Sequence, residues 1–278
     1  MQRKTAILWL VLSLSLLMSA CGTSNTASTG NTASTGSTGS ISGNWIIGLT
    51  DTADTQASIT QSGSLLQNNG LVTGSLIFID SPCSGIGSVQ GSVTGSAVSL
   101  AVNPTGTEIN LTGTMGSASS CASKQACMGG TYTTLSVGCT AGKTIPSTGT
   151  WSATLVSPLN GNITGSLVSN KGSTYTVTGQ VSQGANSGSS STPLTGSLTF
   201  SAGFCYPAAN IVGSISGTSV VMNLVDSDGT QIGQAIATSS LDGTFLTGTY
   251  QYLGQGPGAS KGCTADGTGN VTLAIAGQ

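Results

Sequence analysis

The chain lacks histidine altogether, and only 5% of its 278 residues are charged and 4% aromatic. Without histidine there is no Ser-His or Cys-His nucleophile pair and no imidazole ligand for a metal. Six Lys and Arg residues against eight Asp and Glu residues leave no basic surface for nucleic acid. We therefore expect no enzymatic activity, no cofactor, no metal and no nucleic-acid partner.

The first twenty residues have the pattern of an export signal. Arg3 and Lys4 are followed by an apolar run over residues 6–18. At about 1.5 Å per residue this run is well short of the ~30 Å hydrocarbon core, so it predicts a cleaved signal peptide over residues 1–20.

The end of that segment, residues 17–21, reads Leu-Met-Ser-Ala-Cys and resembles the lipobox of bacterial lipoproteins. Ser19 and Ala20 fit the family pattern, whereas Met18 stands where leucine is usual. The resemblance implies cleavage before Cys21, acylation of Cys21 and insertion of its lipid into a bilayer. Gly22, a residue other than Asp after the cysteine, implies sorting to the outer membrane of a diderm envelope, on its periplasmic or surface face.

The segment after Cys21 is a polar tether. Residues 22–40 contain neither a charge nor a large apolar side chain, and the hexapeptide NTASTG occurs twice. Such a segment cannot bury enough surface to fold, so residues 21–40 are expected to be a disordered linker with a reach of roughly 25 Å. The mature chain would carry four lysines against eight carboxylates, a net charge of −4.

The remainder aligns with itself as two units, 41–157 and 158–278. At a shift of 122 residues, the hexapeptide 71–76 matches 193–198, and Cys83 meets Cys205. With small changes in the shift, 130–132 (Gly-Thr-Tyr) matches 248–250 (Gly-Thr-Tyr). We infer an ancestral module that was duplicated, each copy having a common domain size.

Within each unit the apolar residues alternate with polar ones, which is the period of a β-strand. Dipeptides such as Asn69-Gly70, Asn160-Gly161, Asp228-Gly229 and Asp242-Gly243 predict hairpin turns between the strands. The expected strand centres are Trp45, Ile59, Leu76, Val93, Leu100, Leu111, Tyr132 and Trp151, then Ile163, Val181, Leu198, Ile215, Met222, Ile232, Tyr250 and Leu273. The prediction is an all-β protein of two antiparallel eight-stranded meanders, as closed barrels in preference to sandwiches because closure removes exposed edges.

The cysteines other than Cys21 are even in number, as expected for disulfides in an exported protein. Four of them occupy equivalent places in the two units, so the duplication predicts Cys83–Cys139 and Cys205–Cys263. Cys121 and Cys127 flank an insertion found in one unit and are expected to pair with each other. A zinc site is the disfavoured alternative, because histidine and a C-x-x-C motif are both absent.

The acidic residues offer two weak hypotheses of chemistry. The segment 226–229, Asp-Ser-Asp-Gly, resembles the opening of a calcium loop but lacks the later glutamate, and a plain turn is favoured. A hydrolase would need two carboxylates facing one cleft, and the duplication preserves no such pair.

A different hypothesis concerns the barrel interiors. Residues 149–151 (Gly-Thr-Trp) and 248–250 (Gly-Thr-Tyr) resemble strand beginnings in small barrels such as avidins and lipocalins, families that hold small ligands in a barrel mouth. Inward glycines at Gly74 and Gly196 would leave room for an apolar ligand. The favoured interpretation is that the aromatic residues fill the core instead.

The sequence thus predicts a lipid-anchored protein of the cell envelope with a structural or binding role. Its Thr- and Ser-covered strands suit contact with a polysaccharide or a protein. The alternative is a carrier of a small apolar ligand, and an envelope hydrolase is the least favoured function.

Overall fold

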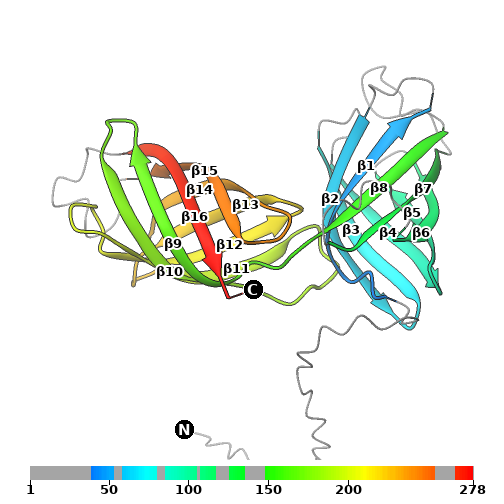
Figure 1. The fold of residues 1–278 in the computed structure, drawn as a ribbon, viewed down its shortest axis with the longest axis horizontal. Coiled ribbons are helices and arrows are strands. Elements are labelled where there is room, and N and C mark those ends of the chain that lie inside the picture. The colour runs from blue at the N-terminus through cyan, green and yellow to red at the C-terminus, as the bar shows by residue number, and fades with distance from the viewer. Residues whose placement is uncertain are drawn as a thin grey trace, which may run out of the picture. The chain divides into compact units, whose positions relative to one another are not determined.

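A computed structural model describes residues 39–52, 58–79, 85–104, 107–116, 125–134, 148–253 and 267–277. These residues form two closed antiparallel β-barrels of eight strands each (Figure 1). In both barrels each strand pairs with its neighbours in sequence, and the last strand closes on the first. The predicted fold, a duplicated all-β meander closed as a barrel, is confirmed.

Sixteen strands make up the two barrels. Barrel 1 consists of β1 (Gly43–Asp51), β2 (Ser58–Asn68), β3 (Leu71–Ile79), β4 (Gly85–Thr94), β5 (Ala97–Asn103), β6 (Ile109–Met115), β7 (Cys127–Thr134) and β8 (Thr148–Val156). Barrel 2 consists of β9 (Asn160–Ser169), β10 (Thr174–Gln183), β11 (Thr192–Phe200), β12 (Ala208–Ser216), β13 (Ser219–Val225), β14 (Gln231–Ser239), β15 (Phe245–Tyr252) and β16 (Thr268–Ala276). Every predicted strand centre lies within one of these strands.

The duplication extends to the register of the strands. Tyr132 on β7 lies opposite Gly149 on β8, and Tyr250 on β15 lies opposite Gly269 on β16. A Cβ atom on either glycine would collide with the ring of the facing tyrosine. The same ring therefore covers the same glycine in both copies, a pairing that bulkier residues at the glycine position would break.

Both barrel interiors are filled by side chains. Inward residues alternate with outward ones along each strand, and the largest buried residue of barrel 1 is Trp45, which is 1% exposed. The Trp45 Nε1–H donates to the Ile41 carbonyl at 2.8 Å, and the Trp151 Nε1–H donates to the Thr112 carbonyl at 3.0 Å. The aromatic residues thus fill the cores, as favoured from the sequence.

The prediction that inward glycines leave room for a ligand is wrong. Gly74 and Gly196 do face inward, but a Cβ atom on Gly74 would collide with the Ser64 carbonyl oxygen. On Gly196 it would collide with the Gln180 carbonyl oxygen. The space next to each glycine is occupied by the adjacent strand, so these residues serve the close approach of two backbones.

The structure confirms the turn predicted at Asn69-Gly70 and contradicts the one predicted at Asn160-Gly161. Asn69 and Gly70 form the tight β2–β3 turn with φ angles of 50° and 80°, which is the left-handed geometry that an Asn-Gly pair accommodates. Asn160 and Gly161, in contrast, lie inside β9, so the turn predicted there is wrong. The Asn160 side-chain oxygen accepts from the Gln183 N–H at 2.8 Å, and Gly161 lets the backbone of Ala276 approach closely.

Several predictions fall outside the described residues. These are the signal peptide over residues 1–20, the acylated Cys21 and most of the tether. Within the described part of the chain, no helix is long and apolar enough to span a bilayer.

Candidate functional site

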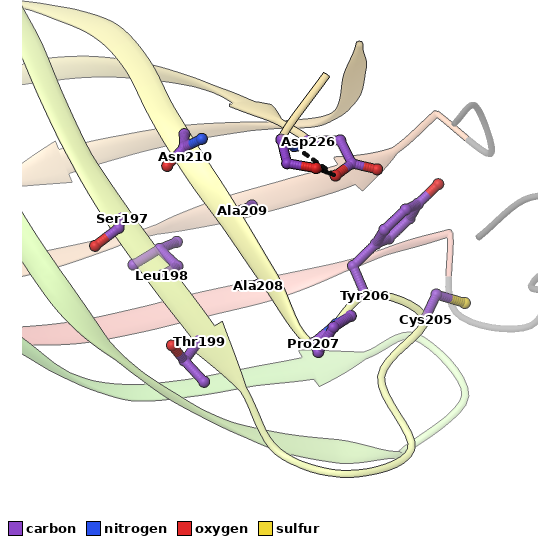
Figure 2. Close-up of a pocket in the computed structure, with 11 residues that line it drawn as sticks. Ser197, Leu198, Thr199, Cys205, Tyr206, Pro207, Ala208, Ala209, Asn210 and Asp226 are labelled. Atoms are coloured by element: carbon purple, nitrogen blue, oxygen red, sulfur yellow. Dashed lines mark hydrogen bonds between the residues drawn. The ribbon is translucent and has the colours of Figure 1, made fainter. Parts of the chain in front are cut away.

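A cavity of about 520 Å³ opens on barrel 2 where β11 ends and β12 begins (Figure 2). We call it the β11–β12 pocket. Its lining residues come from the ends of these two strands, the loop that joins them and the turn after β13: Ser197, Leu198, Thr199, Cys205, Tyr206, Pro207, Ala208, Ala209, Asn210, Asp226 and Ser227.

The hollow exists because the outward residues on β11 and β12 are small or short. Thr199 lies opposite Ala208 in the register, and Ser197 lies opposite Asn210. All four side chains are exposed, and Figure 2 shows them carried by the two paired strands. The alternation of the strands leaves Leu198 and Ala209 facing the core beneath them.

Barrel 1 fills the equivalent positions with larger side chains. At the shift of 122 residues, Thr199 corresponds to Ile77 and Ala208 to Ile86, and these isoleucines lie opposite each other on β3 and β4. The β-branched pair covers the sheet surface that Thr199 and Ala208 leave open. Among the described residues, the outer surface at this place therefore differs between the two copies.

The loop over residues 201–207 forms one wall of the pocket and is anchored by aromatic packing. The Phe204 ring centre lies 4.5 Å from that of Phe200 and 5.0 Å from that of Tyr175. The Tyr206 ring centre lies 5.1 Å from that of Tyr252. Such aromatic pairs contribute about 0.5–1.5 kcal/mol each beyond the area they bury, so they hold this wall of the pocket in place.

Cys205, between these two rings, is disulfide-bonded, and so is Cys127 on β7. In each case the partner cysteine is outside the described residues. Cys83, Cys121, Cys139 and Cys263 all lie in segments that the structure does not describe. The predicted pairings therefore stay predictions. A cross-link at Cys205 would add a covalent constraint to the loop that carries Tyr206 and Pro207 into the pocket wall.

Asp226 supplies the one carboxylate among the described lining residues. Its Oδ1 accepts from the Ser227 N–H and, at 3.1 Å, from the Ser227 hydroxyl. Its backbone closes the β13–β14 turn, with the Asp226 N–H donating to the Thr230 carbonyl at 2.9 Å. The second carboxylate oxygen, Oδ2, has no hydrogen-bond partner within the described segments, so it can accept from a ligand.

The segment 226–229 forms a plain turn. Asp228 Oδ1 accepts from the Thr230 N–H at 2.9 Å, and this hydrogen bond lowers the pKa of the Asp228 carboxyl. In the part of the chain that the structure covers, no three Cys, Asp or Glu residues are grouped to hold a metal ion. Calcium thus has no evident set of ligands at this turn.

The other described acids lie apart from the pocket lining. Asp242 lies in the β14–β15 turn. Its pKa is lowered mainly by the hydrogen bond from the Ser240 hydroxyl and further by those from Thr244. Asp51 ends β1 close to Tyr132; burial raises the pKa of the Tyr132 phenol, and the negative charge of Asp51 raises it further. Among the described residues that line the β11–β12 pocket, Asp226 is the one acid, so they do not include the pair of carboxylates that a hydrolase would need.

Among the lining residues, the sequence singles out Asp226 and Cys205 but not Thr199, Ala208 or Asn210. Periodicity shows that these residues face outward, but it does not show which outward residues leave a hollow. The signal was present in the alignment of the two units, where Thr199 and Ala208 replace Ile77 and Ile86.

Comparisons with known proteins place the chain in no family. No family model matches it, and no curated protein matches it. Among solved structures, the crystal structure of an agglutinin from Burkholderia oklahomensis is 12% identical, with a match covering 84% of this chain and 95% of that chain. The TM-score of 0.19 is too low to establish a common fold.

Proposed function

We propose that this protein is a lipid-anchored component of the cell envelope that binds a neutral glycan in the β11–β12 pocket. The observation that carries the proposal is the pocket itself. It combines hydroxyl, amide and carboxylate side chains with an apolar wall, and its described lining contains no cationic group. Binding sites for small ligands have this composition, in which a few polar groups fix the orientation of the ligand against apolar surface.

The chemistry of the lining matches a sugar. Sugar hydroxyls both donate and accept, so a carboxylate such as Asp226 can accept from them while the Asn210 amide both donates and accepts. The C–H face of a pyranose ring would pack against Pro207 and Ala208. An anionic ligand would instead meet the negative charge of Asp226, with no cation among the described lining residues, which disfavours acidic glycans.

The packed interiors speak against the carrier hypothesis. Large side chains such as Trp45, Trp151 and Tyr250 fill the two barrels, and the inward glycines face backbone instead of open space. A small apolar ligand would have to displace core side chains, at a cost of several kcal/mol. An outward-facing pocket requires no such displacement.

The anchor is the part of the proposal that depends on sequence alone. An acylated Cys21 followed by a polar tether would hold both barrels close to a membrane, which the lipobox and Gly22 imply is the outer membrane, on its periplasmic or surface face. The protein would act by retaining a polysaccharide at that membrane, without catalysis. Replacing Cys21→Ser should release the protein from the membrane fraction, and undiminished retention would contradict the anchor.

The pocket is tested by filling it with the residues of barrel 1. We expect the double variant Thr199→Ile, Ala208→Ile to fold, because the same pair already faces outward at the equivalent place on β3 and β4. The full chain in detergent is screened on an array of neutral and acidic glycans and by affinity electrophoresis in gels that contain soluble polysaccharide. The expected result is binding to a neutral glycan by the natural protein and loss of that binding in the variant.

The matched control is the reverse exchange in barrel 1, Ile77→Thr with Ile86→Ala, which should leave binding unchanged. Binding of no neutral glycan, or equal binding by the filled variant, would overturn the proposal.

A further inference from the structure

Beyond the pocket, a row of amide and hydroxyl side chains crosses the outer face of barrel 2. Asn223 on β13 lies opposite Gln234 on β14, Gln234 opposite Gln251 on β15, and Gln251 opposite Thr268 on β16. We call these four residues the amide row. Since paired residues on neighbouring strands project to the same side, the row presents one polar group per strand.

Hydrogen bonds within the row orient part of it. The Gln234 Nε2 donates to Asn223 Oδ1 at 2.9 Å, and Gln231 Nε2 donates to the same oxygen at 3.1 Å. At the far end, Asn170 Nδ2 donates to the Thr268 hydroxyl at 2.7 Å. Gln251, in the middle, is exposed, and its amide has no hydrogen-bond partner in the described segments.

A groove of about 240 Å³ lies along the middle of the row. It is lined by Asn170, Gln234, Ile236, Thr249, Tyr250, Gln251, Thr268, Gly269 and Asn270. Every described lining residue is uncharged, and Ile236, which is 55% exposed, provides an apolar wall. The groove thus has the same kinds of group as the β11–β12 pocket, without the carboxylate.

The pocket and the groove are joined across the intervening strands. Asn210, from the pocket lining, lies opposite Val225 on β13, and Val225 lies opposite Gln231 on β14. Gln231 in turn donates to Asn223, the first residue of the amide row. From β11 to β16 the path crosses five strand intervals, about 24 Å along the barrel wall at about 4.8 Å per interval.

We infer that the ligand is an extended, neutral polysaccharide chain that lies across strands β11 to β16, with one unit in the pocket and further units along the amide row. The inference rests on the proposed function and names the length and charge class of its ligand. Amide groups both donate and accept, so they can bind sugar hydroxyls without attracting ions. Each such contact is weak, and the affinity is expected to accumulate along the chain.

Barrel 1 does not carry this arrangement. Its equivalent positions are Ala101, Asn110, Thr133 and Thr148, which are opposite one another on β5 to β8. The one amide among them, Asn110, donates to Glu108 at 3.1 Å. Barrel 1 therefore supplies a matched control on the same scaffold.

The test compares short and long ligands on the full chain in detergent. The probes are neutral gluco-, manno- and galacto-oligosaccharides from disaccharides to octasaccharides, and affinities are measured by isothermal titration calorimetry. For the natural protein we expect affinity to rise with length up to the span of the row. The double variant Gln234→Ala, Gln251→Ala should bind disaccharides as before and octasaccharides about ten-fold more weakly.

The control variant Asn110→Ala, Thr133→Ala in barrel 1 should bind every probe as the natural protein does. Affinity that is independent of length, or an unchanged octasaccharide affinity in the row variant, would overturn the inference while leaving the pocket intact. Failure of all the probes to bind the natural protein would overturn the proposed function and the inference together. Circular dichroism of each variant checks that it is folded.

Discussion

The two barrels have the same strands, the same register and the same ring over the same glycine, yet their outer walls differ. Where barrel 1 has Ile77 and Ile86, barrel 2 has Thr199 and Ala208 and a pocket between them. The difference teaches that the alternation of inward residues determines the fold, whereas the outward residues give each copy its own surface chemistry.

Inward positions differ as well, and at one of them barrel 1 has an unusual polar residue. Gln61 on β2 is fully buried, and neither atom of its side-chain amide has a hydrogen-bond partner among the described residues. Its equivalent on β10, two residues before the glycine shared by both strands, is Val177. A buried amide without partners costs free energy that the valine does not.

The largest expected effect concerns the cross-link at Cys205. Replacing Cys205→Ser should lower the free energy of unfolding of barrel 2 by about 4 kcal/mol, because a disulfide restricts the unfolded chain. Chemical denaturation followed by circular dichroism measures the loss. Peptide mapping of the unreduced protein should link Cys205 to Cys263 and Cys83 to Cys139; a link between Cys83 and Cys205 would refute the pairing within each unit.

The next effect should be equal in the two copies. Gly149→Ala and Gly269→Ala each place a methyl group against a tyrosine ring and a carbonyl oxygen of the adjacent strand. We expect each to destabilise its own barrel by about 1–3 kcal/mol through overpacking. Thermal and urea unfolding of the two variants measure this, and a cost confined to one barrel would show that the cores are not equivalent.

The third change should stabilise. Gln61→Leu removes the unpartnered amide at nearly constant volume and is expected to raise the free energy of unfolding of barrel 1 by about 1–2 kcal/mol. The two tryptophans of residues 41–278, Trp45 and Trp151, both lie in barrel 1, so their fluorescence follows the unfolding of that barrel. In barrel 2, Val177→Gln should produce a loss of similar size, and a loss from Gln61→Leu would mean that the amide is satisfied in solution.

The smallest effect is expected in acid. Hydrogen bonds from Thr230 to Asp228, and from Ser240 and Thr244 to Asp242, lower the pKa of each carboxyl in the folded state. A carboxyl whose pKa is lower in the folded than in the unfolded state stabilises the fold at pH values above its unfolded-state pKa. That stabilisation is lost as the pH falls through the folded-state pKa. Since both carboxyls are at the surface, the double variant Asp228→Asn, Asp242→Asn should only slightly weaken the dependence on acidic pH of the free energy of unfolding of barrel 2.

The fold was predictable from the sequence because alternation and duplication are repeated signals. Each strand centre, such as Leu76 or Leu198, is supported by the alternation of apolar and polar residues around it and by the matching residue in the other unit. The Asn160-Gly161 dipeptide misled because the same residues that permit a turn also permit close approach of a neighbouring strand. Local chemistry alone does not distinguish these two uses of glycine.

The candidate site was less predictable because it depends on the absence of large outward side chains at two paired positions. Thr199 and Ala208 are ordinary outward residues, and only their pairing across β11 and β12 makes a hollow. The aromatic wall required the loop 201–207 to bring Phe204 to within 4.5 Å of Phe200, a contact that no sequence period reports. The amide row depends on a register across four strands, which becomes visible only when the strands are paired.

The packed barrel interior has a consequence for how this protein can change over evolutionary time. Because side chains alternate, mutations on the outer wall of β11 to β16 leave the residues that hold the barrel closed untouched. A lineage can therefore try new surface chemistry on one copy while the other keeps its original character. Gene duplication followed by substitutions on the solvent-facing side is enough to give one chain two outer walls of different chemistry.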